Sequence, residues 1–216
     1  MTTETVLYEK FDAEELHPGL QWHSPPQEWS IRGSKKALVV KPGAQTDFWQ
    51  KTHYGFKVDN GHFLYTQARG DVVLTTKVRS YPVHQFDQAG LMVRFSETCW
   101  LKTSVEYDTQ GESKLGVVVT NHGYSDWSTQ NFKSGFTELL FRIRREAGDY
   151  LVEFSEVPQT QTAVPSWTQL RMAHLAEDLH DDTPFQCGLY ACSPQGSGFT
   201  AEFEELHLKQ GRVSGS

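Results

Sequence analysis

The side chains with the clearest catalytic potential in this sequence are closely spaced carboxylates, in which Glu106, Asp108 and Glu112 follow one another. Two carboxylates about 5–5.5 Å apart can cleave a glycosidic bond with retention, one as the nucleophile and one as the general acid. Alternate residues of a strand face the same side, so Glu106 and Asp108 would share a face. Glu112 follows a glycine in a turn-like sequence and would not join them. Glu106 is therefore our candidate catalytic residue, and the run after it is interpreted as a hairpin turn.

A second set of side chains is suited to holding a sugar. Four polar or aromatic residues alternate along one stretch and would share a strand face, namely Asp47, Trp49, Lys51 and His53. An indole offers a flat apolar surface on which the C–H groups of a sugar ring can stack, while polar neighbours bind its hydroxyls. Packing of Trp49 in the core is an alternative of equal weight.

Asp126 and Trp127 form a second pair of this kind. An enzyme that acts on a saccharide would combine Glu106 with a second carboxylate, such as Asp47 or Asp126. In the alternative interpretation, Trp127 only fills one end of the core.

The clearest strands that could position these residues form a hairpin of residues 87–95 and 99–107. Apolar side chains alternate along both, which predicts one face in the core. The opposite face carries Arg94, Lys102 and Glu106. This polar face is interpreted as the floor of a ligand groove. A solvated face, or a cross-strand cluster in which Arg94 meets Glu106, is the alternative.

The remaining sequence predicts an all-β protein. Short alternating segments recur at turn spacings of about ten residues, which is typical of a sandwich or barrel. Asp59-Asn60-Gly61 predicts a tight hairpin turn. Segments 6–11 and 199–208 could pair and close one sheet. Residues 175–182 could form the one short helix, with acidic side chains in a solvated connector.

Composition limits the possible functions. The chain has 216 residues and a formal net charge of −7, which argues against a nucleic-acid surface. No apolar run is long enough to span a membrane, and the N-terminal residues do not resemble a secretory signal. Three cysteines without short paired spacings favour buried, reduced thiols and a cytoplasmic location. We expect a single domain over residues 1–216.

The sequence offers little for metal or cofactor chemistry. Its nine histidines lack the short paired spacings of metal ligands, so we expect no metal and no cofactor. The one basic cluster, Arg142, Arg144 and Arg145, lies on an alternating segment beside glutamates and is interpreted as a solvated face.

Several stretches together resemble the concanavalin A-like family of unknown function that includes the fungal regulation-of-enolase protein. They are residues 46–52, 59–63, 87–94, 100–102 with 106–107, and 117–120 with 125–128. Residues 188–190, 193–194 and 199–203 look like the closing part of many laminin-G and glucanase-like sandwiches. The resemblance implies a jelly-roll sandwich of two antiparallel sheets, whose concave face often holds saccharide in related folds. It implies no established reaction. Laminarinase-type glucanases of this fold carry Glu-x-Asp-x-(x)-Glu on one strand, and here Glu112 lies one residue too far along.

The hypothesis from the sequence is a protein that binds a carbohydrate or sugar derivative on the concave sheet face. Its ligand-binding residues would be Asp47, Trp49, Lys51, His53, Arg94, Lys102, Glu106, Asp126 and Trp127. One alternative is a glycoside-active enzyme that uses Glu106. Another is a regulatory interaction protein of central sugar metabolism, with a protein partner.

Overall fold

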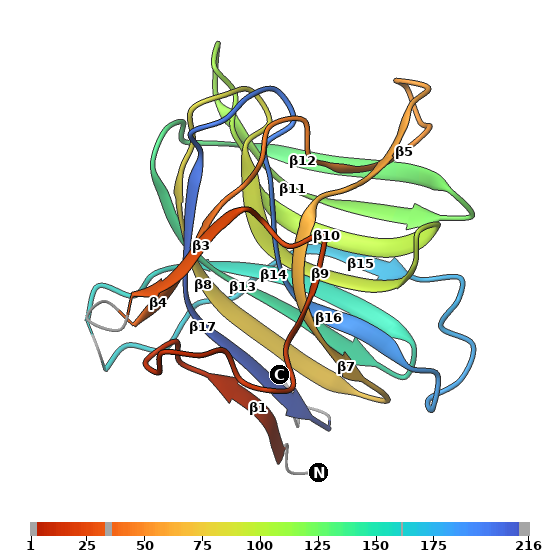
Figure 1. Cartoon of the computed structure of the whole chain (residues 1–216). Helices are drawn as coiled ribbons and strands as arrows, with labels where there is room; N and C mark the ends of the chain where they lie inside the picture. The colour runs from red at the N-terminus through yellow and green to blue at the C-terminus, as the bar shows by residue number, and fades with distance from the viewer. Residues whose placement is uncertain (1–3, 33–35, 161, 212–216) are drawn as a thin grey trace.

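The computed structural model describes residues 4–32, 36–160 and 162–211. These residues form strands and no helix. The longer strands build two antiparallel sheets that face each other (Figure 1). The expected all-β, concanavalin A-like jelly-roll sandwich is therefore confirmed.

Sheet I takes its strands from both halves of the chain. Its order is β15 (Thr168–His174), β14 (Asp149–Glu156), β13 (Thr137–Glu146), β8 (Val72–Tyr81), β17 (Thr200–Gln210), β4 (Ala37–Lys41) and β3 (Glu28–Arg32). The first strand, β1 (Glu4–Glu9), pairs with the last, and Tyr8 lies opposite His207. The expected pairing of the terminal segments is confirmed.

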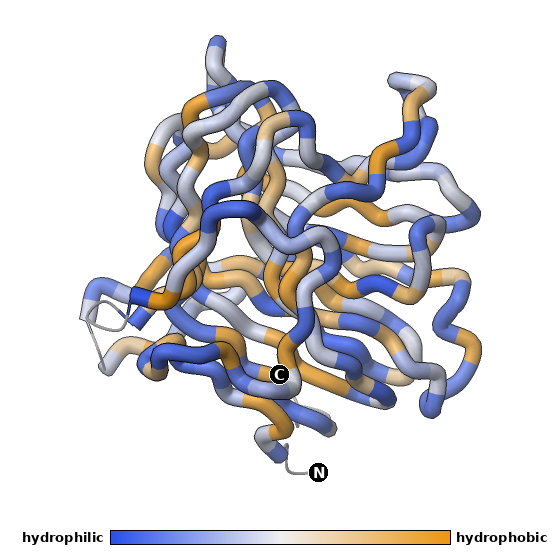
Figure 2. Tube along the Cα trace, viewed as in Figure 1, coloured by the Kyte–Doolittle hydropathy of each residue, from blue (hydrophilic) through white to orange (hydrophobic). Residues whose placement is uncertain are grey.

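Sheet II contains the predicted central hairpin. Its order is β12 (Tyr124–Phe132), β11 (Ser113–Asn121), β10 (Cys99–Glu106), β9 (Gln88–Ser96), β16 (Phe185–Cys192), β7 (His62–Ala68) and β2 (Gln21–His23). Leu91 and Leu101 point to the main core between the sheets, as their alternation predicts. Hydrophobic stretches accordingly follow the strands, whereas hydrophilic residues gather in the connections (Figure 2).

The outer face of sheet II is also largely covered. A two-stranded ribbon of β5 (Phe48–Gln50) and β6 (Lys57–Asp59) packs on it. Phe48 lies 6.2 Å from the ring of Trp100 and 6.4 Å from that of Tyr190, measured between ring centroids. A second apolar cluster therefore lies outside the main core. This covering ribbon explains why β10 is buried along its whole length.

Two local expectations were wrong. Asn60-Gly61 does not turn a hairpin, because β6 pairs with β5 whereas β7 belongs to sheet II. The Asn60 side chain instead holds the ribbon, accepting a hydrogen bond from the backbone amide of Asp47 at 3.0 Å and donating one to the Gln45 carbonyl at 3.0 Å.

Residues 175–182 form turns and no helix. Their acidic side chains are not all solvated, because Asp178 is buried and receives two hydrogen bonds of 2.7 Å from Arg145. Arg145 is itself buried, so the basic cluster is not a wholly solvated face. Alternation placed the Arg145 side chain between the sheets, where only a carboxylate partner makes its charge tolerable.

At Gly90 the central hairpin leaves no room for a side chain, so a single added methyl group is expected to lower stability strongly. A Cβ atom added to Gly90 would overlap the backbone carbonyl oxygen of Thr103. Gly90→Ala is therefore expected to lower the free energy of unfolding by about 3 kcal/mol or more, measured by urea denaturation. Gly111→Ala is the matched control, because a Cβ there meets no heavy atom of the described residues within 4 Å. Equal stability of the two variants would contradict this packing.

Candidate ligand-binding site

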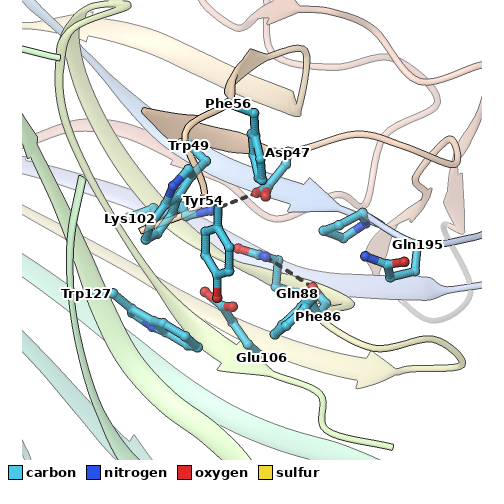
Figure 3. Close-up of a pocket in the computed structure, with 11 residues that line it drawn as sticks. Asp47, Trp49, Tyr54, Phe56, Phe86, Gln88, Lys102, Glu106, Trp127 and Gln195 are labelled. Atoms are coloured by element: carbon cyan, nitrogen blue, oxygen red, sulfur yellow. Dashed lines mark hydrogen bonds and ion pairs between the residues drawn. The ribbon is translucent and has the colours of Figure 1, made fainter. Parts of the chain in front are cut away.

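A cavity of about 160 Å³ lies on the outer face of sheet II, beside the covering ribbon. Its walls combine acidic, basic, amide and aromatic side chains (Figure 3). They are Asp47, Trp49, Tyr54, Phe56, Phe86, Gln88, Lys102, Glu106, Trp127, Pro194 and Gln195. The floor comes from β9 and β10, and the walls come from the ribbon with its connecting loop, from Phe86, from β12 and from the 194–195 loop.

The ribbon positions Asp47 and Trp49 on the same side of β5, as alternation predicts. The strand then ends abruptly, because Lys51 and His53 adopt positive φ angles of 57° and 63°. These angles turn the chain back on itself, and the backbone amide of Lys51 donates to the carbonyl of Phe56 at 2.8 Å. The indole nitrogen of Trp49 donates to the Thr52 carbonyl at 2.9 Å, which fixes the ring against this loop.

The returning loop adds two exposed aromatic rings to the cavity. Tyr54 meets Trp49 edge-to-face at 5.4 Å between centroids, and Phe56 stacks on Tyr54 at 5.7 Å. Trp127 lies on the opposite wall and comes from the edge strand β12 (Figure 3). The cavity therefore has aromatic surfaces on two sides, with the polar floor between them.

Lys102 is held by an ion pair and two rings. Its Nζ atom lies 3.0 Å from Asp47 Oδ1 and donates a hydrogen bond to it. The same atom lies 5.8 Å from the ring centroid of Trp100 and 5.7 Å from that of Tyr190, within cation–π range. Burial lowers the pKa of Lys102, but Asp47 and Glu106 outweigh this effect and raise its pKa above the ordinary value. Lys102 is therefore a charged group.

Glu106 is the most unusual group of the floor. Burial raises the pKa of its carboxyl from 4.5 to about 7, against the opposing effect of Lys102 and with a smaller contribution from Asp47. A carboxyl with this pKa changes charge near neutral pH and can donate or accept a hydrogen bond there. Such a perturbed group in a cavity is a physical marker of a functional site.

Gln88 lies directly opposite Glu106 across the β9–β10 ladder. Its Oε1 accepts a hydrogen bond of 3.1 Å from the Tyr190 hydroxyl, and its Nε2 donates one of 3.1 Å to the Phe86 carbonyl. These bonds orient the amide, so this part of the floor is preorganised before any ligand binds.

The structure brings five of the nine expected binding residues together around the cavity. They are Asp47, Trp49, Lys102, Glu106 and Trp127. The other four, namely Lys51, His53, Arg94 and Asp126, lie elsewhere, for reasons that the backbone geometry explains.

Lys51 and His53 leave the cavity because the strand ends before them. Lys51 Nζ lies 4.5 Å from the ring centroid of Tyr124, and the exposed His53 ring packs against Tyr54. Asp126 precedes Trp127 on β12 and so points to the opposite face, where it pairs with Arg171 at 3.6 Å.

Arg94 does not meet Glu106. The register of β9 and β10 places Arg94 opposite Trp100, at the other end of the hairpin from Glu106. Arg94 instead donates two hydrogen bonds to Asp59 at 2.6 and 2.8 Å, a bidentate pair that fastens the ribbon to sheet II.

Sequence reasoning missed several residues that line the cavity, although the sequence pattern around three of them could have identified them. Gln88 shares the strand face of Arg94 by simple alternation. Tyr54 and Phe56 lie in the same aromatic-rich stretch as Trp49. Phe86, Pro194 and Gln195 are loop residues whose approach depends on the three-dimensional fold, and no local pattern marks them.

The described part of the chain shows no metal site, disulfide or membrane-spanning helix. Its histidine, cysteine and acidic side chains form no group of three that could hold a metal ion. The three cysteines are free and buried. The described residues also contain no helix able to cross a membrane.

The fold and the cavity define a concanavalin A-like β-sandwich with a small pocket on the outer face of one sheet. The chain belongs to the family described as "Protein of unknown function (DUF1349)", which matches residues 22–211. This confirms the resemblance inferred from the sequence. The chain is 30% identical over 194 residues to "Regulation of enolase protein 1" of Saccharomyces cerevisiae, and the match covers 90% of each protein.

Solved structures support the same fold. A functionally unknown protein from Saccharomyces cerevisiae has a TM-score of 0.77 and 27% identity, covering 90% of this chain and 98% of that one. The GH43B protein of a Bacteroides ovatus xyloglucan locus has a TM-score of 0.71 and 19% identity. That match covers 93% of this chain but 38% of the larger protein, and at this identity it shows the fold alone.

Proposed function

We propose that this protein binds a small saccharide or sugar derivative in the cavity on sheet II. The observation that carries the proposal is a buried, oriented polar floor between aromatic walls. Aromatic rings match the apolar faces of a sugar, and the floor groups match its hydroxyls. At about 160 Å³ the cavity is small and suits a single sugar unit, whereas a long polysaccharide would need an open groove.

Binding is favoured over hydrolysis because Asp47, the second carboxylate of the cavity, is held in an ion pair. Asp47 and Glu106 both line the cavity, as a glycosidase would need. However, Asp47 is already engaged by Lys102 at 3.0 Å, and Asp126 points away. The pair therefore lacks a free nucleophile beside the acid.

Titration calorimetry with a panel of monosaccharides, disaccharides and their derivatives tests this proposal. At least one sugar is expected to bind, and Trp127→Ala is expected to weaken it at least about tenfold, or about 1.4 kcal/mol, because the ring loses its stacking surface. Trp29→Ala is the matched control, since Trp29 is a half-exposed tryptophan on β3 of the other sheet. Absence of binding throughout the panel would contradict the proposal.

A second candidate function is an interaction with a protein of central sugar metabolism. It is favoured by the 30% identity to a yeast protein whose name assigns it to the regulation of enolase. Calorimetric titration with purified enolase, with and without a bound sugar, tests this role. Such a role would place the protein in the cytoplasm, and three free, buried cysteines are compatible with that location.

A further inference from the structure

The charges around the cavity do not balance. Three side chains with ordinary acidic or basic groups line it, Asp47, Lys102 and Glu106. Asp47 and Lys102 neutralise each other through their 3.0 Å ion pair. Glu106 has no ion-pair partner among the described residues. When Glu106 is ionised, the cavity therefore holds one uncompensated negative charge.

The Glu106 carboxylate is also poorly supplied with hydrogen-bond donors. The neighbouring Gln88 amide is already engaged with Tyr190 and Phe86. Within the described residues, no side chain or backbone amide forms a hydrogen bond to the carboxylate. An ionised carboxylate accepts several hydrogen bonds, so these positions remain open to a ligand. Figure 3 shows the carboxylate directed into the cavity.

The aromatic walls favour the same kind of ligand. The face of an aromatic ring carries partial negative charge and attracts a cation within about 6 Å, with tryptophan the strongest. Trp49 and Tyr54 on one wall and Trp127 on the other surround the space above Glu106. The cavity thus presents a carboxylate below and aromatic rings beside it, which is an environment suited to an ammonium group.

An anionic ligand fits poorly. The ammonium of Lys102 is bound to Asp47, so a phosphate or sugar acid would have to displace that carboxylate and approach Glu106. Like charges in a buried site repel strongly because water screens them little.

Building on the proposed function, we propose that the ligand is an amino sugar with a free amine, whose ammonium group pairs with Glu106. The apolar face of the sugar ring lies against the indole of Trp127. The Lys102–Asp47 pair supplies hydrogen-bonding groups to the hydroxyls.

The test compares matched sugars by titration calorimetry near neutral pH. Glucosamine, galactosamine and mannosamine are each measured beside the parent hexose, the N-acetyl derivative and the hexose 6-phosphate. At least one free amino sugar is expected to bind about tenfold or more tightly than its parent, its N-acetyl form and its phosphate, because only it supplies the cation.

Two variants distinguish the contribution of the Glu106 carboxylate to the affinity from nonspecific effects of removing a carboxylate. Glu106→Gln is expected to lower the affinity for the amino sugar at least about tenfold. Glu112→Gln is the matched control, because Glu112 lies in the exposed turn after β10, where Asn131 donates to it. The affinity of the Glu112→Gln variant for the amino sugar is expected to equal that of the unsubstituted protein.

The failures are distinguishable. If a parent hexose or N-acetyl sugar binds as tightly as the amino sugar, the inference about the amine is overturned while sugar binding stands. If tetramethylammonium competes with every sugar and binds more tightly than all of them, the site recognises a cation without a sugar ring, which also overturns it. If no sugar of any class binds, the proposed function itself fails.

Discussion

Glu106→Gln is expected to stabilise this protein by about 3 kcal/mol at about pH 8 and to have little effect at about pH 4. The folded-state pKa of about 7 lies some 2.5 pH units above 4.5, and each unit corresponds to about 1.36 kcal/mol. The folded protein holds this proton more tightly than the unfolded chain does. Stability therefore falls as pH rises from about 4.5 to about 7, and Gln removes that loss.

The pH window follows from the groups that face Glu106. The pKa of Lys102 is raised above its ordinary value, and burial raises the pKa of Tyr190 and Cys192 well above theirs. None of these groups is expected to change charge between about pH 5 and 8, so the change in this range belongs to Glu106.

Urea denaturation of both proteins at several pH values measures the effect. The stability difference is expected to grow across the window and to level off above it, whereas Glu112→Gln should give a small, pH-independent change. A constant difference for Glu106→Gln, or destabilisation at every pH, would contradict the assigned environment. A stabilising substitution that abolishes binding would also show that Glu106 serves function at a cost in stability.

Arg145→Ala is expected to destabilise the protein by about 3–5 kcal/mol, because it leaves Asp178 charged and buried without its partner. The Asp178 side chain has no exposed surface, and it accepts hydrogen bonds from Arg145 and, at 2.6 Å, from the Tyr150 hydroxyl. This cluster anchors residues 175–182, which were expected to form a short helix.

The matched control is Arg171→Ala, which breaks an ion pair with the largely exposed Asp126. Its expected effect on the free energy of unfolding is within about 1 kcal/mol. Replacing both partners of the buried pair, as Arg145→Met with Asp178→Leu, should recover much of the stability, since no lone charge remains. A loss below about 1 kcal/mol for Arg145→Ala would show that the cluster contributes little.

Period-two alternation was enough to find the floor of the cavity. It placed Lys102 and Glu106 on one face of the central hairpin and the apolar residues on the other, and both assignments hold. It also placed Asp47 and Trp49 together. These successes have one physical basis, because the strand geometry fixes the face of each residue wherever the strand remains regular.

The wrong predictions concern residues beyond the end of a regular strand, or residues whose neighbours depend on the pairing of strands far apart in the sequence. Positive φ angles at Lys51 and His53 ended the strand and removed both from the cavity. The ladder register, which local sequence does not reveal, separated Arg94 from Glu106. The covering ribbon, which turns an open sheet face into a cavity, is held by contacts between residues far apart in the sequence, such as the pair of Arg94 and Asp59.

The assignment of the cavity as the sugar-binding site is tested most directly by a crystal structure. The protein is crystallised with the sugar that binds most tightly in the calorimetric panel. Sugar density is expected between Trp49 and Trp127, with a ligand polar atom within hydrogen-bond distance of the Glu106 carboxylate. The Lys102–Asp47 pair should remain intact beneath it. Density on another surface of the molecule, with this cavity holding only water, would contradict the assignment of the site.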